Sequence, residues 1–211
     1  MQTTIFDNYR KWVQDQTMPK GKRAVLLASL DLFAQHGYAS TSTAQIAQQA
    51  AVSQATIFKY FKTKQDLLLA ILQPIIENLI PQYRDDFLPK INQFATLPTI
   101  VHFIVSDRYQ FIKANADAMI ILLTELLTND TVHHQFFAMI QSSQPLFMQH
   151  VVPALKKAGI HADLDLGAVI RTIVGQLMTY FFQQRLMPNI PVDEAHDLQL
   201  IEAQIIRAIE K

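Results

Sequence analysis

Apolar side chains recur at intervals close to 3.6 residues along almost the whole chain, and this helical period is the feature that most restricts its fold. In residues 20–36 the apolar run ends just before Gly37, the residue type favoured directly after a helix. No segment of useful length alternates apolar and polar residues as a half-buried strand does. The sequence therefore predicts an all-α fold with about nine helices.

Capping residues and prolines indicate where these helices begin and end. N-caps are expected at Thr41 or Ser42, at Ser53 and at Thr63. Ser42 with Gln45 matches a capping box, and Asp66 lies three residues after Thr63, in the first turn. The later helices are expected to start, end or kink at prolines. These are Pro74, Pro81, Pro89, Pro98, Pro145, Pro188 and Pro191.

Two short capped helices joined by three residues predict a helix-turn-helix motif over residues 42–61. In such a motif the second helix enters the major groove of DNA by its N-terminal end. Gln54 suits adenine there and Thr56 suits a thymine methyl group. Lys59, Tyr60 and Lys64 lie where they could reach phosphates. Spacing alone leaves a plain helical hairpin equally open.

Charge is uneven beneath a net charge of zero. Residues 1–67 hold eight basic and four acidic groups, a net charge of +4, so the remainder carries −4. A basic N-terminal part on an acidic body suggests that only the N-terminal part meets a polyanion. Ordinary surface charge is the alternative interpretation.

Composition and motifs exclude several classes of protein. The chain has no cysteine, which excludes disulfides, thiolate metal sites and cysteine nucleophiles. Its five glycines lack the spacing of phosphate-binding loops and of a nucleophile elbow. His133 and His134 are adjacent, so their rings point to different helix faces and no metal site is expected. We therefore expect no enzymatic activity, no cofactor and no metal.

Targeting and membrane segments are not expected either. Residues 1–18 carry charges and no apolar core of a signal peptide. The longest stretch without Asp, Glu, Lys or Arg, residues 131–155, contains too many polar residues for a membrane span. We therefore expect a soluble, cytoplasmic protein with no membrane partner.

One continuous pattern of caps and core positions extends over residues 20–72. It includes Gly37-Tyr38-x-x-Thr41-Ser42-x-x-x-Ile46-Ala47-x-x-Ala50-x-Val52-Ser53, then Thr56-Ile57-Phe58-x-Tyr60-Phe61-x-x-Lys64-x-x-Leu67-Leu68. This pattern resembles the N-terminal domain of TetR/AcrR-family transcriptional regulators. The resemblance implies a DNA-binding site, with contacts expected from Thr41, Ser42, Thr43, Ser53, Gln54, Ala55, Thr56, Phe58, Lys59, Tyr60 and Lys64. It also implies a small core of Val25, Ile46, Val52, Ile57 and Phe61.

Three positions depart from the family pattern. The family usually has glycine at the positions of Ala51 and, often, Ala55, and tyrosine at the position of Phe58. Alanine at 51 is expected to disfavour a left-handed turn residue. Ala55 is expected to hinder close approach of the backbone to a phosphate, and Phe58 has no hydroxyl to donate to one.

The resemblance implies three parts: an N-terminal extension over residues 1–19, the DNA-binding domain over 20–72, and a ligand-binding and dimerisation domain over 73–211. Tyr9 and Trp12 in the extension could dock on the body or form an extra arm. Aromatic and methionine side chains of the body are candidates for a pocket that binds a small hydrophobic effector. They are Phe103, Tyr109, Phe111, Met119, Phe136, Phe137, Met139, Phe147 and Tyr180.

The last two expected helices are strongly apolar, and the resemblance favours burying them between two chains rather than within one. The candidate interface residues are Leu166, Ile170, Ile173, Gly175, Leu177, Phe181, Leu198, Ile201, Ile205 and Ile209. The sequence thus predicts a homodimeric, ligand-responsive regulator, a repressor that a small hydrophobic effector releases from a palindromic operator in double-stranded DNA. The alternatives are a helical small-molecule-binding protein without a DNA role and an all-α enzyme without a known motif.

Overall fold

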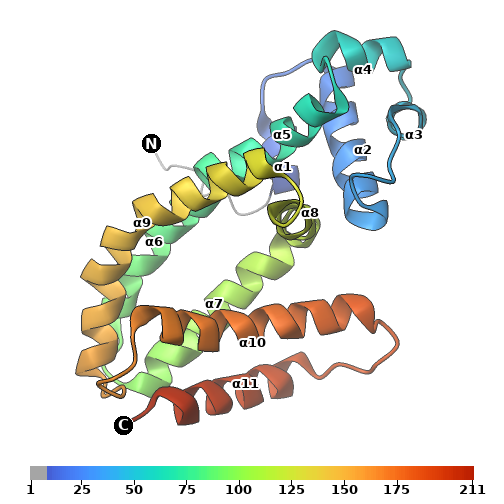
Figure 1. Cartoon of the computed structure of the whole chain (residues 1–211). Coiled ribbons are helices and arrows are strands. Elements are labelled where there is room, and N and C mark those ends of the chain that lie inside the picture. Colours follow the sequence, from blue (N-terminus) through green and yellow to red (C-terminus); the bar gives the residue numbers. More distant parts are fainter. Residues whose placement is uncertain (1–8) are drawn as a thin grey trace. The chain divides into compact units, whose positions relative to one another are not determined.

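The computed structural model describes residues 9–211, which form eleven α-helices and no β-strand apart from an isolated bridge (Figure 1). The predicted all-α fold class is confirmed. The helices exceed the expected nine because residues 9–15 and 80–90 are also helical. The α-helices are α1 (Tyr9–Asp15), α2 (Lys20–His36), α3 (Thr43–Gln49), α4 (Gln54–Tyr60), α5 (Lys64–Pro74), α6 (Ile80–Lys90), α7 (Leu97–Ala114), α8 (Ala116–Leu126), α9 (Asp130–Lys157), α10 (Leu166–Leu186) and α11 (Glu194–Ile209).

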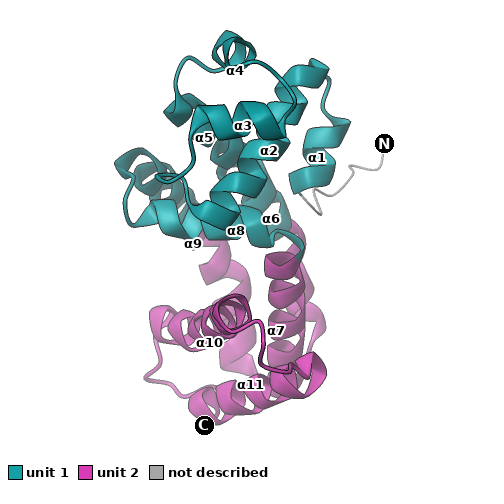
Figure 2. Ribbon diagram, turned by 90° about the vertical axis from the view of Figure 1, so that its right-hand side faces the viewer, with its two compact units in different colours: residues 1–84, 114–142 teal, residues 85–113, 143–211 magenta. Residues whose placement is uncertain are grey.

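The chain divides into two compact units, each built from two separate stretches of sequence (Figure 2). Among the described residues, unit 1 contains residues 9–84 and 114–142, and unit 2 contains residues 85–113 and 143–211. Helix α8 packs on α2 and α5, so it shares unit 1 with the helix-turn-helix motif. The expected boundary after residue 72 concerns function and remains a prediction.

Several prolines lie at or near the ends of helices, where the missing N–H is least costly, whereas Pro145 and Pro153 lie inside α9. Helix α5 ends at Pro74 and continues into a π-helical turn, η1 (Ile75–Leu79), before α6. The N–H of Ile80 donates to the carbonyl of Ile75, five residues earlier, which is the bond of a π-helix. A 3-10 turn, η2 (Ile91–Gln93), follows α6, and Pro98 lies in the first turn of α7.

Helices α9, α10 and α11 complete the chain. Helix α9 is a single long helix that contains Pro145, where a kink is expected. The C-terminal residues return to the loop after α9: the N–H of Lys211 donates to the carbonyl of Gly159 at 3.0 Å. Along residues 9–211, no helix combines the length and hydropathy needed to cross a bilayer.

Candidate functional site

Hydroxyl side chains begin the two helices of the helix-turn-helix motif, as predicted. The Oγ of Ser42 accepts the N–H of Gln45 at 3.2 Å, and the Gln45 side chain accepts the N–H of Ser42 at 2.8 Å. The Oγ of Ser53 accepts the N–H of Thr56 at 3.1 Å. These bonds satisfy N–H groups that have no partner inside a helix, so α3 and α4 each start at a fixed residue.

The turn between α3 and α4 contradicts one expectation, because Ala51 is left-handed with a φ of 52°. The N–H of Val52 donates to the carbonyl of Ala47 at 3.0 Å, and the N–H of Ala51 to that of Gln48 at 3.2 Å. These are the two bonds of a Schellman motif, which closes the end of α3. The motif therefore forms despite a strain of about 1–2 kcal/mol from the alanine Cβ.

Apolar side chains hold α3 and α4 against α2. Val25, Ile46, Ile57 and Phe61 are buried as expected, whereas Val52 is half-buried because it lies between the exposed residues of the turn. Each buried side chain of this size stabilises the fold by about 1.5–3 kcal/mol. Helix α4 has seven residues, too few to be stable alone, so this core determines its orientation.

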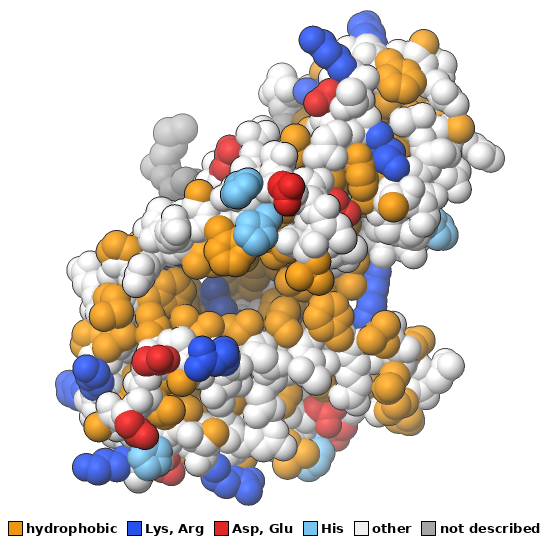
Figure 3. Space-filling view, in the orientation of Figure 1, with side chains coloured by type: hydrophobic (Ala, Val, Ile, Leu, Met, Phe, Trp, Pro, Cys, Tyr) orange, Lys and Arg blue, Asp and Glu red, His pale blue; other side chains and the backbone are white. Residues whose placement is uncertain are grey.

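The N-terminal end and one side of α4 face solvent. Gln54, Ala55 and Lys59 are exposed, and Phe58 has a relative exposure of 47%. Lys and Arg side chains gather at this end of unit 1 (Figure 3). The surface therefore presents amide, methyl, aromatic and ammonium groups together.

Other residues predicted to contact DNA are partly buried or make hydrogen bonds within the chain. Thr41 is buried, and its Oγ1 donates to the carbonyl of Gly37 at 2.9 Å. The hydroxyls of Ser53 and Thr56 lie 2.9 Å apart and share a hydrogen bond. Thr43, Thr56 and Tyr60 are half-buried, while Ser42 and Ser53 are exposed. The expectation that Thr41 faces a DNA backbone does not hold for its hydroxyl, because that group closes the loop before α3.

Lys64 also has a different position from the one expected. Its Nζ donates to the carbonyls of Tyr38 at 2.8 Å, Thr41 at 2.9 Å and Ala39 at 3.4 Å. It also lies 4.3 Å from the centroid of the Tyr38 ring. An ammonium group has three donors, and the loop before α3 accepts all three. The phosphate contact expected from this amine remains a prediction, and it would require the loop to release one or more of these bonds.

A chain of polar side chains connects the same loop to α8. The Tyr38 hydroxyl donates to Oε1 of Gln65 at 3.1 Å. Asn129 donates to the same atom at 3.4 Å and to Glu125 Oε2 at 3.3 Å. Burial raises the pKa of Glu125, while the hydrogen bond from Asn129 and the charge of Lys64 act against the rise. Glu125 and Asn129 are four residues apart, but sequence analysis missed the chain because Tyr38, Gln65 and Asn129 are far apart in sequence.

The residues predicted to line a pocket are divided between the two units. Unit 1 contains Met119, Phe136, Phe137 and Met139, and unit 2 contains Phe103, Tyr109, Phe111, Phe147 and Tyr180. In unit 2 the Phe103 ring stacks on Phe87 at 5.1 Å and on Phe94 at 4.8 Å between centroids. Phe103 is thus part of an aromatic cluster, and its role in a pocket remains a prediction.

Tyr109 and Tyr180 connect the helices of unit 2 through their hydroxyl groups. Tyr109 donates to Gln184 at 3.1 Å and to Glu194 at 3.2 Å. Tyr180 donates to Asp197 at 3.0 Å. Burial is the main cause that raises the pKa of Tyr109 to about 12. Both hydroxyls therefore stay protonated at neutral pH and hold α11 in place.

Most residues expected at a dimer interface are already buried within one chain, and their part in an interface remains a prediction. Ile173, Leu177, Phe181, Ile201, Ile205 and Ile209 are buried, Leu166 and Leu198 are half-buried, and Ile170 and Gly175 are exposed. The reason is that α10 and α11 pack against each other. The apolar side chains left exposed on these helices include Ile170, Val174 and Leu200, at 38%, 46% and 45%.

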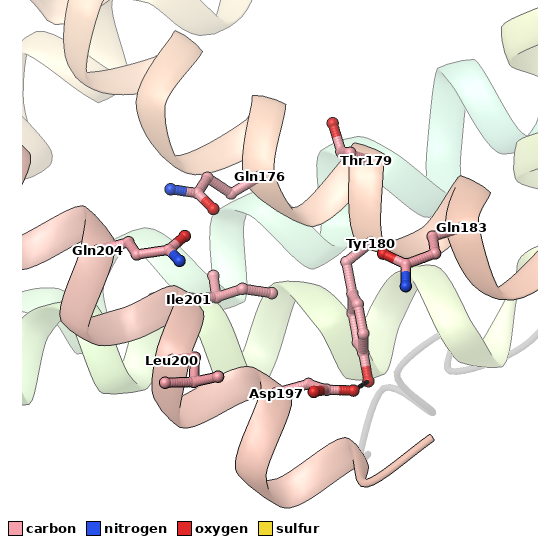
Figure 4. Close-up of a pocket in the computed structure, with 8 residues that line it drawn as sticks. All are labelled: Gln176, Thr179, Tyr180, Gln183, Asp197, Leu200, Ile201 and Gln204. Carbon is pink, nitrogen blue, oxygen red and sulfur yellow. Dashed lines mark hydrogen bonds between the residues drawn. The ribbon is translucent and has the colours of Figure 1, made fainter. Parts of the chain in front are cut away.

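A groove runs between α10 and α11 (Figure 4). It is lined by Gln176, Thr179, Tyr180, Gln183, Asp197, Leu200, Ile201 and Gln204. Figure 4 shows the Tyr180 hydroxyl directed at Asp197, with glutamine side chains from both helices around the groove. The groove therefore combines aliphatic contact with amide donors and acceptors.

Comparison with known proteins extends this description. Residues 25–71 match the model of the bacterial regulatory proteins of the tetR family. The HTH-type transcriptional regulator RutR of Escherichia coli K12 is 38% identical over 71 residues, which cover 32% of this chain and 34% of RutR. The HTH-type transcriptional repressor KstR2 of Rhodococcus jostii RHA1 is 24% identical over 162 residues, which cover 74% of this chain and 76% of KstR2.

A solved structure resembles the chain over more of its length. The transcriptional regulator FadR of Bacillus subtilis, solved in complex with stearoyl-CoA, has a TM-score of 0.60 and 18% identity. The match covers 87% of this chain and 95% of FadR. At this identity the likeness shows a shared fold.

Fold and site together define a protein whose helix-turn-helix motif precedes a larger helical part. The N-terminal domain belongs to the tetR family of bacterial regulatory proteins, which confirms the resemblance seen in residues 20–72. The chain spans about a third of the length of the first curated relatives that it matches.

Proposed function

We propose that the chain is a ligand-responsive transcriptional regulator, a repressor that binds a palindromic DNA operator as a homodimer and leaves it when a small hydrophobic effector binds. The observation that carries the proposal is the exposed N-terminal end of α4, held at a fixed angle by a buried core. A helix presented in this way fits the major groove. The family of the N-terminal domain supports the same function.

The contacts to DNA follow from what α4 exposes. Gln54 pairs with adenine through its amide, and Ala55 and Phe58 meet thymine methyl groups. Lys59 neutralises a phosphate, and the exposed hydroxyl of Ser42 donates to another. The Phe58 ring cannot donate a hydrogen bond, so apolar contact is its only contribution.

Selection of bound sequences from random duplex DNA by the full chain tests this proposal. At about 50–100 mM salt, where phosphate contacts are strong, we expect an enriched sequence with two inverted half-sites. Failure to retain any duplex at this salt concentration would contradict the DNA-binding role. That failure would favour the alternative, a helical small-molecule-binding protein.

Dimerisation is proposed through α10 and α11, whose exposed apolar side chains include Ile170, Val174 and Leu200. A self-complementary patch of this kind gives a closed two-fold dimer, with an expected buried area of about 1,200–2,000 Å² or more. Gly175 is the sharpest probe, because a Cβ built there meets no other atom within 4 Å. Gly175→Leu should therefore leave the isolated chain folded and separate the two copies.

Light scattering of the full chain distinguishes the outcomes. The wild type should have about twice the mass of 24.1 kDa that one chain has. Gly175→Leu should have the mass of one chain, with an unchanged helical spectrum. A Gly175→Leu protein that still dimerises would exclude this face as the interface.

The effector is proposed to be hydrophobic or amphipathic, because the part of the chain beyond residue 72 is rich in aromatic and methionine side chains. The stearoyl-CoA complex of FadR supports a ligand of this type. Stearoyl-CoA itself is a suitable first probe. If it binds, it should raise the melting temperature by mass action and weaken operator binding. Stabilisation without any loss of operator affinity would contradict its role as an inducer.

A further inference from the structure

Helix α1 lies outside the segment that matches the tetR family, and it is docked at both ends. Tyr9 and Val13 are buried, and the N–H of Tyr9 donates to Asn115 Oδ1, next to the start of α8, at 3.0 Å. At the other end, Arg23 of α2 donates to the carbonyls of Val13 at 3.2 Å and Gln16 at 2.6 Å. Helix α1 therefore connects the start of α8 to the first helix of the DNA-binding domain.

Arg10 of α1 adds an ionic contact between the same two helices. Its guanidinium donates to Asp31 Oδ1 of α2 at 2.5 Å and to Asp117 Oδ2 of α8. We call this contact of Arg10, Asp31 and Asp117 the clasp. The planar guanidinium suits such a position, because its several donors can serve two carboxylates at once. Without Arg10 the two carboxylates would repel each other.

The clasp holds one end of α8, and a separate connection holds the other. At the C-terminal end, Glu125 is linked through Asn129 and Gln65 to Tyr38, in the loop before α3. Helix α1 has only seven residues, and a helix of that length is unstable without docking. The order of α1 is therefore coupled to the arrangement of α2 and α8.

We propose that α1 and its clasp form a regulatory element that fixes α8 to the DNA-binding domain and thereby sets operator affinity. This inference rests on the proposed DNA-binding function. When the clasp is closed, the DNA-binding domain is already ordered before it meets DNA. When the clasp is open, part of the binding free energy is spent on ordering the domain, so operator affinity is lower. An effector that moves α8 would act on the DNA-binding domain through the same contact.

Removing a carboxylate gives the sharpest test, because the proposed role of the clasp and simple electrostatics predict opposite changes in operator affinity. Asp117→Asn removes one negative charge from a chain whose net charge is zero, which by charge alone strengthens binding to DNA. The clasp predicts instead that the operator Kd rises about tenfold. Glu77→Gln is the matched control: it removes an exposed carboxylate of unit 1 that accepts a hydrogen bond from Gln73. Its operator Kd should stay unchanged or fall.

A second pair of variants separates the clasp from a direct phosphate contact. Arg10→Ala and Lys11→Ala each remove one positive charge from α1. The clasp predicts a loss of operator affinity of about tenfold for Arg10→Ala and less than about twofold for Lys11→Ala. The salt slope of log Kd should be unchanged in Arg10→Ala. A slope lower by about one unit would assign Arg10 to a phosphate and overturn the clasp.

Hydrogen exchange of the full chain supplies a readout that does not use DNA. Amides of α1 and of the first turn of α8 should exchange faster in Asp117→Asn than in Glu77→Gln. Arg10→Lys keeps the charge but not the planar guanidinium, so its amides should exchange at rates between those of the wild type and Asp117→Asn. This variant also replaces Arg10→Ala if Arg10→Ala does not fold. A wild type that binds no duplex would contradict the proposed function. If the wild type binds operator and Asp117→Asn binds it equally well or better, the regulatory role of the clasp is wrong, while the proposed DNA-binding function stands.

Discussion

The helix pairs α3–α4 and α10–α11 both pack through apolar side chains, yet they expose different chemistry. Helices α3 and α4 bury Ile46 and Ile57 and expose mainly polar and small side chains, with Phe58 as the exception. Helices α10 and α11 bury a longer apolar stripe and still expose Ile170 and Val174. A polar outer face suits a hydrated polyanion, whereas an apolar outer face suits another protein surface.

This difference divides the proposed function between the two helix pairs. If it is correct, substitutions on α10 should change assembly, and substitutions on α4 should change recognition of DNA without changing assembly.

The largest effect is expected from a charge on the apolar face. Val174→Glu places a carboxylate in the proposed interface, where its desolvation is unfavourable. We expect a protein with the mass of one chain in light scattering and an operator affinity at least about 100-fold weaker, because one domain alone loses the second half-site. Gln48→Glu, on the exposed face of α3, is the control and should remain dimeric. If Val174→Glu and Gln48→Glu have equal masses, the exposed face of α10 is no more important for assembly than that of α3.

A smaller effect is expected from the polar end of α4. Gln54→Ala should relax the base preference at one operator position, with a loss of about 1–3 kcal/mol in binding free energy. The mass in light scattering should not change. Binding to a set of operators substituted at each position measures the loss, with Gln48→Ala as the control. A uniform loss at every position would argue against base recognition by Gln54.

The C-terminal ends of α3 and α9 have the same hydrogen bonds, so substitutions there can be compared by their effect on the free energy of unfolding. Gly159 follows α9 with a φ of 92°, and its Schellman bonds match those at Ala51, whose φ is 52°. Ala51→Gly should relieve strain and stabilise the protein by about 0.5–1 kcal/mol. Gly159→Ala should destabilise it by about 1 kcal/mol through backbone strain alone, since a Cβ there meets nothing within 4 Å. Denaturant titrations measure both, and a destabilising Ala51→Gly would contradict the assigned strain.

The smallest effect concerns two lysines in and next to the helix-turn-helix motif. Lys59 is exposed, whereas the Lys64 ammonium donates to three carbonyls of the loop before α3. Lys59→Ala should lower the salt slope of operator binding by about one unit, and Lys64→Ala should leave the slope unchanged. Titrations at several salt concentrations decide between them. The opposite pattern would mean that the loop opens and releases Lys64 to a phosphate.

Local signals made the helix-turn-helix region largely predictable from sequence. The caps at Ser42, Ser53 and Thr63 depend on residues three positions away, and the structure contains all three. The left-handed Ala51 was not predictable, because propensity disfavours it and only the closed Schellman turn outweighs that preference.

Long-range pairing explains what sequence analysis missed. The stripe Ile201, Ile205 and Ile209 is visible in the sequence, but a stripe does not say whether its partner is in the same chain or another. The clasp between Arg10, Asp31 and Asp117 has no spacing signal, since it joins three separate helices. The same limit applies to Lys64, whose acceptors lie more than twenty residues away in the chain.

The spacing of the half-sites tests the central claim most directly, namely that two copies joined through α10 and α11 each present α4 to DNA. Operators with base pairs inserted between the half-sites are titrated with the full chain. Binding should fall by about 100-fold or more when roughly five base pairs, half a helical turn, are added. Equal affinity for the original and the lengthened operator would contradict the account, because it would mean that each α4 binds DNA independently of a partner copy.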